Sequence, residues 1–317
     1  MTFENVAFYS TNVGAGTSPH GEAYIHTSGI VFVEVWNNSG TFNNCSFANA
    51  VIAIRGRKSS SSTVIPKTIT VNRCSFIECK MPIQGYCEKV LVNNSSFANY
   101  GDLYSGDHCI YIERYGCKSL KISNCVVETL HSESGAAFQI YGTPKAGDAL
   151  PELSVQGCLI DGNGILSASG AKATIKDCVF NEQSSEQFIA WIESGSLILR
   201  DSEINHSYAF SYANSTAKVY ALNCTFRLMT DLGRVRCNFP LVSSNCTYVD
   251  WGGNVRVDGT QFLGCTFTRI GTHTLNGLYI SNNNGYSIIL RNTRFQNGDK
   301  ITNNENAIKE YSNCSQF

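Results

Sequence analysis

The sequence is poor in charged residues. Asp, Glu, Lys and Arg make up 15% of its 317 residues, against about 25% in an average globular protein. The formal net charge is −1 at pH 7. A chain so close to neutral lacks the basic surface that nucleic acids and anionic membranes attract. We therefore expect no nucleic-acid partner.

Long apolar runs and helical periodicity are also lacking. No stretch approaches the roughly 18 apolar residues needed to cross a bilayer, and the first thirty residues have neither the basic start nor the long apolar segment of a signal peptide. No window shows a sustained apolar period of 3.6 residues. We predict almost no helix and no membrane insertion.

A four-residue phrase recurs along the chain instead, as in Asn44-Cys45-Ser46-Phe47 and Asn223-Cys224-Thr225-Phe226. A turn residue precedes a small sulfur or hydroxyl residue, which we call the anchor, and the phrase usually ends on an aromatic or aliphatic residue. Successive anchors are separated by about 20 residues plus a variable excess, which is typical of a solenoid with loops inserted into its coils. The anchors are Cys45, Cys74, Ser95, Cys125, Cys158, Cys178, Ser202, Cys224, Cys246, Cys265, Thr293 and Cys314.

The residue before the anchor is informative. It is Asn at seven of the twelve anchors, Asp at two, Gly at two and Arg at one. Asn, Asp and Gly tolerate left-handed backbone geometry. The sequence therefore predicts a sharp bend at the same place in every coil, with Asn side chains stacked along it.

Nine of the fourteen cysteines occupy the anchor position. A position shared with Ser and Thr requires a small residue, so we predict an interior stack of free thiols, formed in a reducing cytoplasm. A disulfide framework of a secreted protein is the alternative. The other five cysteines include no Cys-x-x-Cys pair, so we expect no zinc site and no cofactor.

The coil around Cys125 shows the expected order of elements. An alternating strand at 120–123 is followed by a bend at Asn124, a short strand, a loop, and a second alternating strand at 136–141. Strand alternation places six side chains on one exposed face. Aromatic rings beside carboxylates and amides bind sugars, although a neighbouring subunit could equally cover such a face. The six residues are Tyr111, Glu113, Gln139, Tyr141, Trp191 and Glu193.

This order resembles the right-handed single-stranded parallel β-helix of the pectate-lyase-like superfamily, over essentially the whole chain. The resemblance implies an all-β solenoid of about 12–13 coils, with residues 1–317 forming one domain. Residues 2–8 already read as part of a coil, and the chain stops on the anchor Cys314 with no closing strand. Because β-helix ends are normally capped, we expect a segment of a longer chain.

Two carboxylates stand at the same place in successive coils. Glu128 and Asp161 each follow their anchor by three residues, so stacking would bring them roughly 5 Å apart. Retaining glycosidases use carboxyl groups ~5–5.5 Å apart, and such a pair would have separated pKa values. A chance stacking of solvated acids is the alternative. Glu113 and Glu133 are further candidate acids.

The stretch Gly106-Asp107-His108-Cys109-Ile110-Tyr111-Ile112 looks like the Asp-His-Gly-Ile-Tyr phrase of β-helix proteins that handle polysaccharides, with Cys109 in place of Gly. Beside Asp107, His108 could shuttle protons near neutral pH. Alternatively, His108 closes a turn and caps the next strand. Arg55 and Arg114 are basic candidates for another lyase chemistry, and Arg55 is also a candidate to bind substrate.

With its low charge and its predicted stack of thiols, the chain most resembles the central β-helix of a bacteriophage tailspike. The resemblance implies a homotrimer, assembled in the host cytoplasm, that works in the virion tail beside other tail proteins. It also implies binding, and often cleavage, of capsular polysaccharide or lipopolysaccharide O-antigen by a hydrolase or lyase. A non-enzymatic receptor-binding or structural module is the alternative, and a bacterial polysaccharide lyase or epimerase is a third reading.

Overall fold

The computed structural model describes residues 1–10, 16–17, 23–24, 31–58, 63–100, 108–129, 136–142, 149–162, 165–167, 170–181, 188–205, 208–210, 217–227, 236–237, 241–250, 254–255, 259–270, 278–280, 288–296, 301–302 and 308–316. Every regular element in these ranges is a β-strand. The chain divides into two compact units, residues 1–169 and 170–317.

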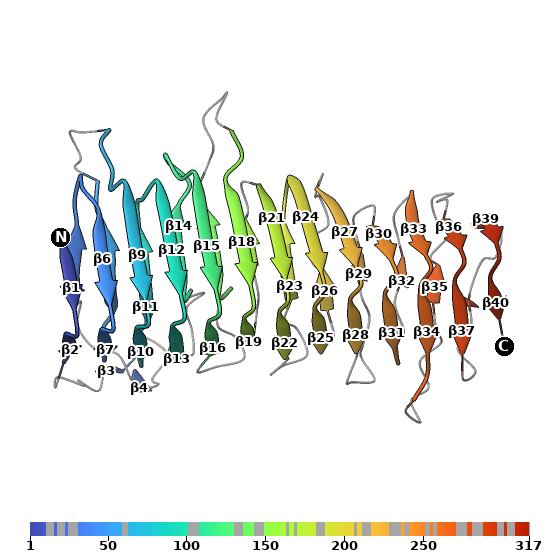
Figure 1. Ribbon diagram of the computed structural model, residues 1–317, viewed down its shortest axis with the longest axis horizontal. Helices are drawn as coiled ribbons and strands as arrows, with labels where there is room; N and C mark the ends of the chain where they lie inside the picture. The colour runs from blue at the N-terminus through green and yellow to red at the C-terminus, as the bar shows by residue number, and fades with distance from the viewer. Residues whose placement is uncertain are drawn as a thin grey trace. The chain divides into compact units, whose positions relative to one another are not determined.

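The first unit contains three parallel sheets, in which strands of successive coils lie side by side (Figure 1). After the first coil, each strand pairs with the third strand that follows it. The first sheet holds β1 (Thr2–Glu4), β6 (Gly40–Asn43), β9 (Thr68–Asn72), β12 (Lys89–Asn93), β15 (Ser119–Ser123) and β18 (Glu152–Gln156). The second holds β2 (Ala7–Tyr9), β7 (Ser46–Ala48), β10 (Ser75–Ile77), β13 (Ser96–Tyr100), β16 (Val126–Thr129) and β19 (Leu159–Asp161). The third holds β5 (Val31–Val35), β8 (Ile52–Gly56), β11 (Met81–Gly85), β14 (Ile110–Glu113), β17 (Phe138–Tyr141) and β20 (Ile165–Ser167), and an antiparallel pair, β3 (Gly16–Thr17) and β4 (Ala23–Tyr24), is inserted in the first coil.

The second unit repeats this order. Its first sheet holds β21 (Ala171–Lys176), β24 (Gly195–Arg200), β27 (Lys218–Leu222), β30 (Leu241–Ser244), β33 (Thr260–Leu263), β36 (Ile288–Arg291) and β39 (Ile308–Ser312). The second holds β22 (Val179–Asn181), β25 (Glu203–Asn205), β28 (Thr225–Arg227), β31 (Thr247–Val249), β34 (Thr266–Thr268), β37 (Arg294–Gln296) and β40 (Ser315–Gln316). The remaining side is formed by β23 (Phe188–Ile192) with β26 (Tyr208–Phe210), and by β29 (Arg236–Cys237), β32 (Asn254–Val255), β35 (Leu278–Ile280) and β38 (Ile301–Thr302).

This topology is a parallel β-helix, because each turn of the chain adds one strand to every side. The first sheet has six strands in the first unit and seven in the second. The prediction of an all-β parallel β-helix of about 12–13 coils is therefore confirmed. The expectation of one domain over residues 1–317 stays a prediction.

The predicted bend precedes every anchor. The twelve residues at this position have φ between 50° and 65°, including the one arginine, Arg73. Their side chains also bond from coil to coil, as predicted: Asn124 Nδ2 donates to Asn94 Oδ1 at 3.4 Å. In the second unit, Asn223 Nδ2 donates to Asp201 Oδ1 at 3.1 Å.

The anchor side chain has two hydrogen-bonding roles. Ser95 Oγ accepts the Cys74 N–H of the preceding coil at 3.1 Å and donates to Asn93 O at 2.8 Å. Cys158 does the same, accepting the Cys125 N–H at 3.4 Å and donating to a backbone carbonyl at 3.3 Å. A buried N–H at the bend would otherwise lack a partner. Cys, Ser and Thr therefore share this position because each is a small donor and acceptor.

The thiol stack is confirmed for the described side chains. All thirteen cysteines described there are free, and twelve of them are buried. Aromatic columns run beside them: in the first unit, the ring centroids of Phe8, Phe47, Phe76 and Phe97 follow one another at 4.9, 4.8 and 4.7 Å. The repeated phrase is therefore scaffold, with the anchor and the aromatic residue filling the core.

Candidate functional site

The outer face of the third sheet in the first unit carries a row of aromatic and polar side chains. In β14, Ile110 and Ile112 are buried while Tyr111 and Glu113 point outward. Tyr111 pairs with Gln139, and Glu113 pairs with Tyr141. These four predicted residues are therefore brought together. With Arg55, Gln84 and Tyr86 of the preceding coils, they form what we call the platform.

The platform follows from strand register and from a glycine turn. Arg55 lies opposite Gln84, and Gln84 lies opposite Tyr111, so the row advances by one strand spacing, about 4.8 Å, per coil. Gly85 at the end of β11 has φ 113°, a conformation that other residues rarely adopt. A Cβ there would also collide with the carbonyl of Gly56.

Glu113 is the acid of the platform, and its carboxyl is bonded and partly buried. Tyr111 donates its hydroxyl proton to Glu113 Oε1 at 3.4 Å, and the Tyr111 and Tyr141 rings lie 6.0 Å apart. Burial raises the pKa of the Glu113 carboxyl, and the Tyr111 bond opposes this in part. Burial also raises the pKa of Tyr111, with a smaller contribution from Glu113. A carboxyl with a raised pKa is suited to donate a proton.

Two amide oxygens of the platform are buried without a hydrogen-bond donor. They are Gln84 Oε1 and Gln139 Oε1. We expected Gln139 on the exposed face, but it is only 4% exposed, since bulky outward neighbours such as Tyr111 stand one strand spacing away. Tyr141, by contrast, is 49% exposed. The platform thus combines an open aromatic ring with two amide oxygens that are enclosed beneath its surface.

Cations border the platform at the end of β8. The Arg57 guanidinium lies over the Trp36 ring, 5.2 Å from its centroid. Its Nε also forms an ion pair with Glu34 Oε1 at 3.3 Å, without the alignment of a hydrogen bond. Lys58 Nζ lies 4.2 Å from the Tyr115 centroid and 5.8 Å from that of Tyr86. Sequence reasoning missed Trp36, Arg57, Lys58, Gln84, Tyr86 and Tyr115, although counting alternate residues from the strand ends would have placed Gln84 and Tyr86 outward.

His108 packs beneath this face rather than on it. Its ring lies 5.7 Å from that of Tyr111, and Nδ1 is 3.0 Å from Ala136 O. Burial lowers the pKa of His108 to about 4, so it is neutral near pH 7. The arrangement matches the alternative in which His108 closes a turn. Its predicted partner Asp107, and Glu133, lie outside the described residues.

Arg114 is also internal. Its side chain is buried, with Nη2 2.6 Å from Ala149 O and Nη1 3.5 Å from Cys117 O. Its guanidinium bonds to backbone carbonyls and does not face solvent.

The carboxylate pair predicted by counting from the anchors is in register. Glu128 of β16 lies directly opposite Asp161 of β19. Glu128 is exposed and Asp161 is half-buried. The pair belongs to the second sheet, however, whereas the platform belongs to the third. The structure therefore places these two acids opposite each other in the strand register, and places Glu113 with the aromatic residues instead.

Trp191 and Glu193 belong to the second unit. Ile192 at the end of β23 is buried, and both neighbours are half-buried, as strand alternation predicts.

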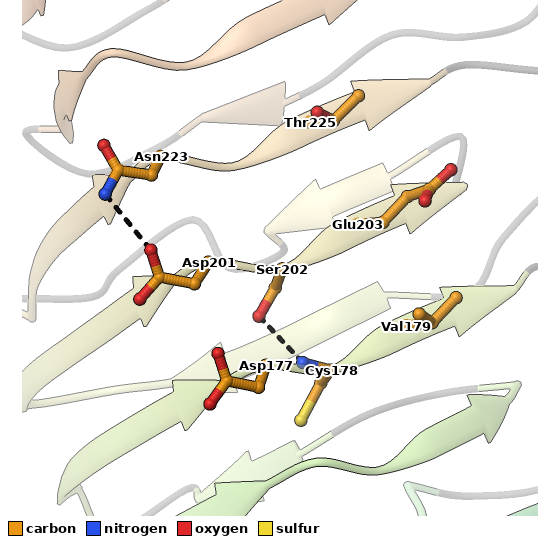
Figure 2. A pocket seen from close by; sticks show the side chains of 8 residues that line it. All are labelled: Asp177, Cys178, Val179, Asp201, Ser202, Glu203, Asn223 and Thr225. Atoms are coloured by element: carbon orange, nitrogen blue, oxygen red, sulfur yellow. Dashed lines mark hydrogen bonds between the residues drawn. The ribbon is translucent and has the colours of Figure 1, made fainter.

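A hollow of about 510 Å³ lies on the second unit, along the anchor bends (Figure 2). Figure 2 shows Asp177, Asp201 and Asn223 stacked on one side, with Asp201 bonded to Asn223. The aspartates that line the hollow already have cationic partners. Asp177 Oδ2 lies 3.2 Å from Lys176 Nζ, and Asp201 Oδ2 lies 2.9 Å from Arg200 Nε. A third acid of the hollow, Glu203, pairs with Arg227 at 3.1 Å. The stacked side chains at the bends therefore form this hollow, and their charges are already paired within the protein.

Within the described ranges, no cluster of three or more His, Cys, Asp or Glu side chains is arranged to hold a metal ion. The same residues include no helix of the length and apolarity needed to cross a membrane. Comparison with known proteins gives no match, whether with family models, curated proteins or solved structures.

Proposed function

We propose that the chain is a polysaccharide-binding β-helix and that the platform is its glycan site. The observation that supports this best is the exposed Tyr141 ring, which lies opposite Glu113 in the strand register and beside the Tyr111 ring. Sugars stack an apolar face on aromatic rings and donate hydroxyl protons to carboxylates such as that of Glu113. A row that repeats at about 4.8 Å per coil also suits an extended polymer.

The biological setting that we propose is a bacteriophage tail. There the chain would be the β-helix of a homotrimeric tailspike, held by other tail proteins, that recognises capsular polysaccharide or O-antigen on the host. The support is the resemblance of the strand, bend and anchor order to that class of protein. A structural rod is the alternative, and it predicts no affinity for glycans.

A panel of purified bacterial capsules and O-antigens would test binding by affinity electrophoresis. Replacement of Tyr141 by Ala should weaken binding to the recognised polymer about tenfold, because a stacked aromatic contact of ~1–1.5 kcal/mol is lost. Tyr9→Ala is the matched control, since Tyr9 is a 69% exposed tyrosine of the same unit on β2. Equal effects of the two substitutions, or no binding to any polymer, would contradict the proposed site.

Cleavage is a second proposed activity, and the raised pKa of Glu113 favours it. A carboxylic acid beside a bound glycan can protonate the leaving oxygen, and burial shifts the pKa of Glu113 in the direction that this role requires. Glu113→Gln should then lower the depolymerisation rate by roughly 10²-fold or more while binding persists.

The competing arrangement uses Glu128 and Asp161. Size-exclusion chromatography of the polymer after incubation measures its chain length and would distinguish Glu113 from the Glu128 and Asp161 pair as the catalytic acid. If Glu128→Gln or Asp161→Asn abolishes chain shortening and Glu113→Gln does not, the acid lies on the second sheet. If the polymer is bound and never shortened by the wild type, the chain is a binder only.

A further inference from the structure

We propose that the polysaccharide bound at the platform is acidic, and that Arg55 and Lys58 bind its carboxylate. The inference rests on the proposed function and adds the substrate class. It comes from the charges around the platform, which differ in sign from the chain as a whole, whose formal net charge is −1.

Arg55 belongs to the platform and Lys58 borders it, and neither cation is neutralised there. Arg55 lies on the outward row of β8, directly opposite Gln84. Lys58 Nζ is held over the Tyr86 and Tyr115 rings. Among the described residues, the ion pairs involve neither Arg55 nor Lys58. The positive charge of each side chain is therefore available to an anionic ligand.

The acids nearby are already engaged. Glu34 lies opposite Arg55 in the strand register, but its carboxylate is in an ion pair with Arg57. Glu113 stands on β14, two coils away from β8, where its carboxyl accepts the Tyr111 hydroxyl. The end of the platform at β8 therefore carries an excess of positive charge.

A uronic acid residue satisfies all of these groups together. Its carboxylate would lie between the Arg55 guanidinium and the Lys58 ammonium, which bind carboxylates by charge-assisted hydrogen bonds. The next sugar along the row would stack near the exposed Tyr141 ring. A neutral glycan would leave both cations without an anion.

The test compares acidic bacterial capsules, hyaluronan and polygalacturonate with the same polymers after reduction of their carboxyl groups to alcohols. Affinity is measured for the wild type, for Arg55→Gln with Lys58→Gln, and for Lys89→Gln. Lys89 is an exposed lysine of β12 on the first sheet and serves as the matched control. Thermal unfolding of each variant shows that the fold is kept.

We expect the wild type to bind at least one acidic polymer and to lose roughly tenfold or more in affinity when its carboxyl groups are reduced. The double variant should lose affinity for the acidic polymer to a similar extent and become insensitive to the reduction, while Lys89→Gln binds as the wild type does. Binding of neutral polymers that depends on Tyr141 but not on Arg55 or Lys58 would overturn the acidic class and leave the glycan site standing. No binding to any polymer would overturn both.

Discussion

Replacing Ser95 by Ala tests the role of the anchor in the coil. Ser95 Oγ accepts the Cys74 N–H at 3.1 Å and donates to Asn93 O at 2.8 Å, and both bonds are internal. The substitution removes one oxygen and little volume, so cavity formation contributes little. What remains is a buried N–H of Cys74 with no acceptor.

The loss of stability in Ser95→Ala depends on which hydrogen-bond partner of Ser95 is left without another partner. Asn93 O also accepts the Arg73 N–H at 3.1 Å, so it stays bonded after the substitution. The Cys74 N–H has no such second partner, and an unsatisfied buried donor costs ~1–3 kcal/mol. We therefore expect Ser95→Ala to destabilise the protein by about 2 kcal/mol, mostly through this one group.

The matched control is Ser95→Cys. Cysteine at the anchor accepts the same N–H at 3.4 Å in other coils, as Cys74 does from Cys45, so this variant should stay within ~1 kcal/mol of the wild type. Urea unfolding followed by far-ultraviolet circular dichroism measures the difference, and hydrogen exchange at the Cys74 amide locates it. Ser202, which accepts the Cys178 N–H at 3.1 Å, offers the same pair of variants in the second unit.

Equal stability of the Ala and Cys variants would refute the reasoning. It would mean that the anchor is selected for size alone and that the N–H at the bend finds another partner. Faster exchange of the Cys74 amide in the Ala variant, with no change in the Cys variant, would support the bond as the cause.

Two further predictions concern backbone geometry and pH. Asn124 has φ 52°, so Asn124→Val should destabilise by ~1–2 kcal/mol in thermal unfolding while Asn124→Gly stays near the wild type, and equal melting temperatures would contradict this. The pKa of His108 is lowered to about 4 in the folded chain, below its unfolded value of about 6.5. The unfolded state therefore binds the proton first, so stability is fully present above about pH 6.5 and falls by up to ~3 kcal/mol as the pH drops toward 4. Urea titrations at several pH values should show this loss, and His108→Phe should remove it; an unchanged pH profile in that variant would count against the buried neutral ring.

The sequence alone was enough to predict the scaffold. A solenoid repeats one local arrangement, so the bend before the anchor, the free thiols and the inward aromatic column are properties of a short phrase read many times. Counting from the anchor also placed Glu128 opposite Asp161, because strand register in a stacked coil is set by distance from the bend. The outward positions of Tyr111 and Tyr141 followed from alternation alone.

Only the tertiary structure decided how the outward residues group into a site. Loops of unequal length separate the strands, so the sequence did not show that Glu128 stands on the second sheet while Glu113 stands with the tyrosines on the third. It also did not show that Gln139 is covered, since burial of an outward residue depends on neighbours one coil away. The position of Lys58 over Tyr86 and Tyr115 joins residues from three coils. Contacts of this kind depend on packing between coils and not on the pattern within one, and they are the contacts on which the proposed glycan site rests.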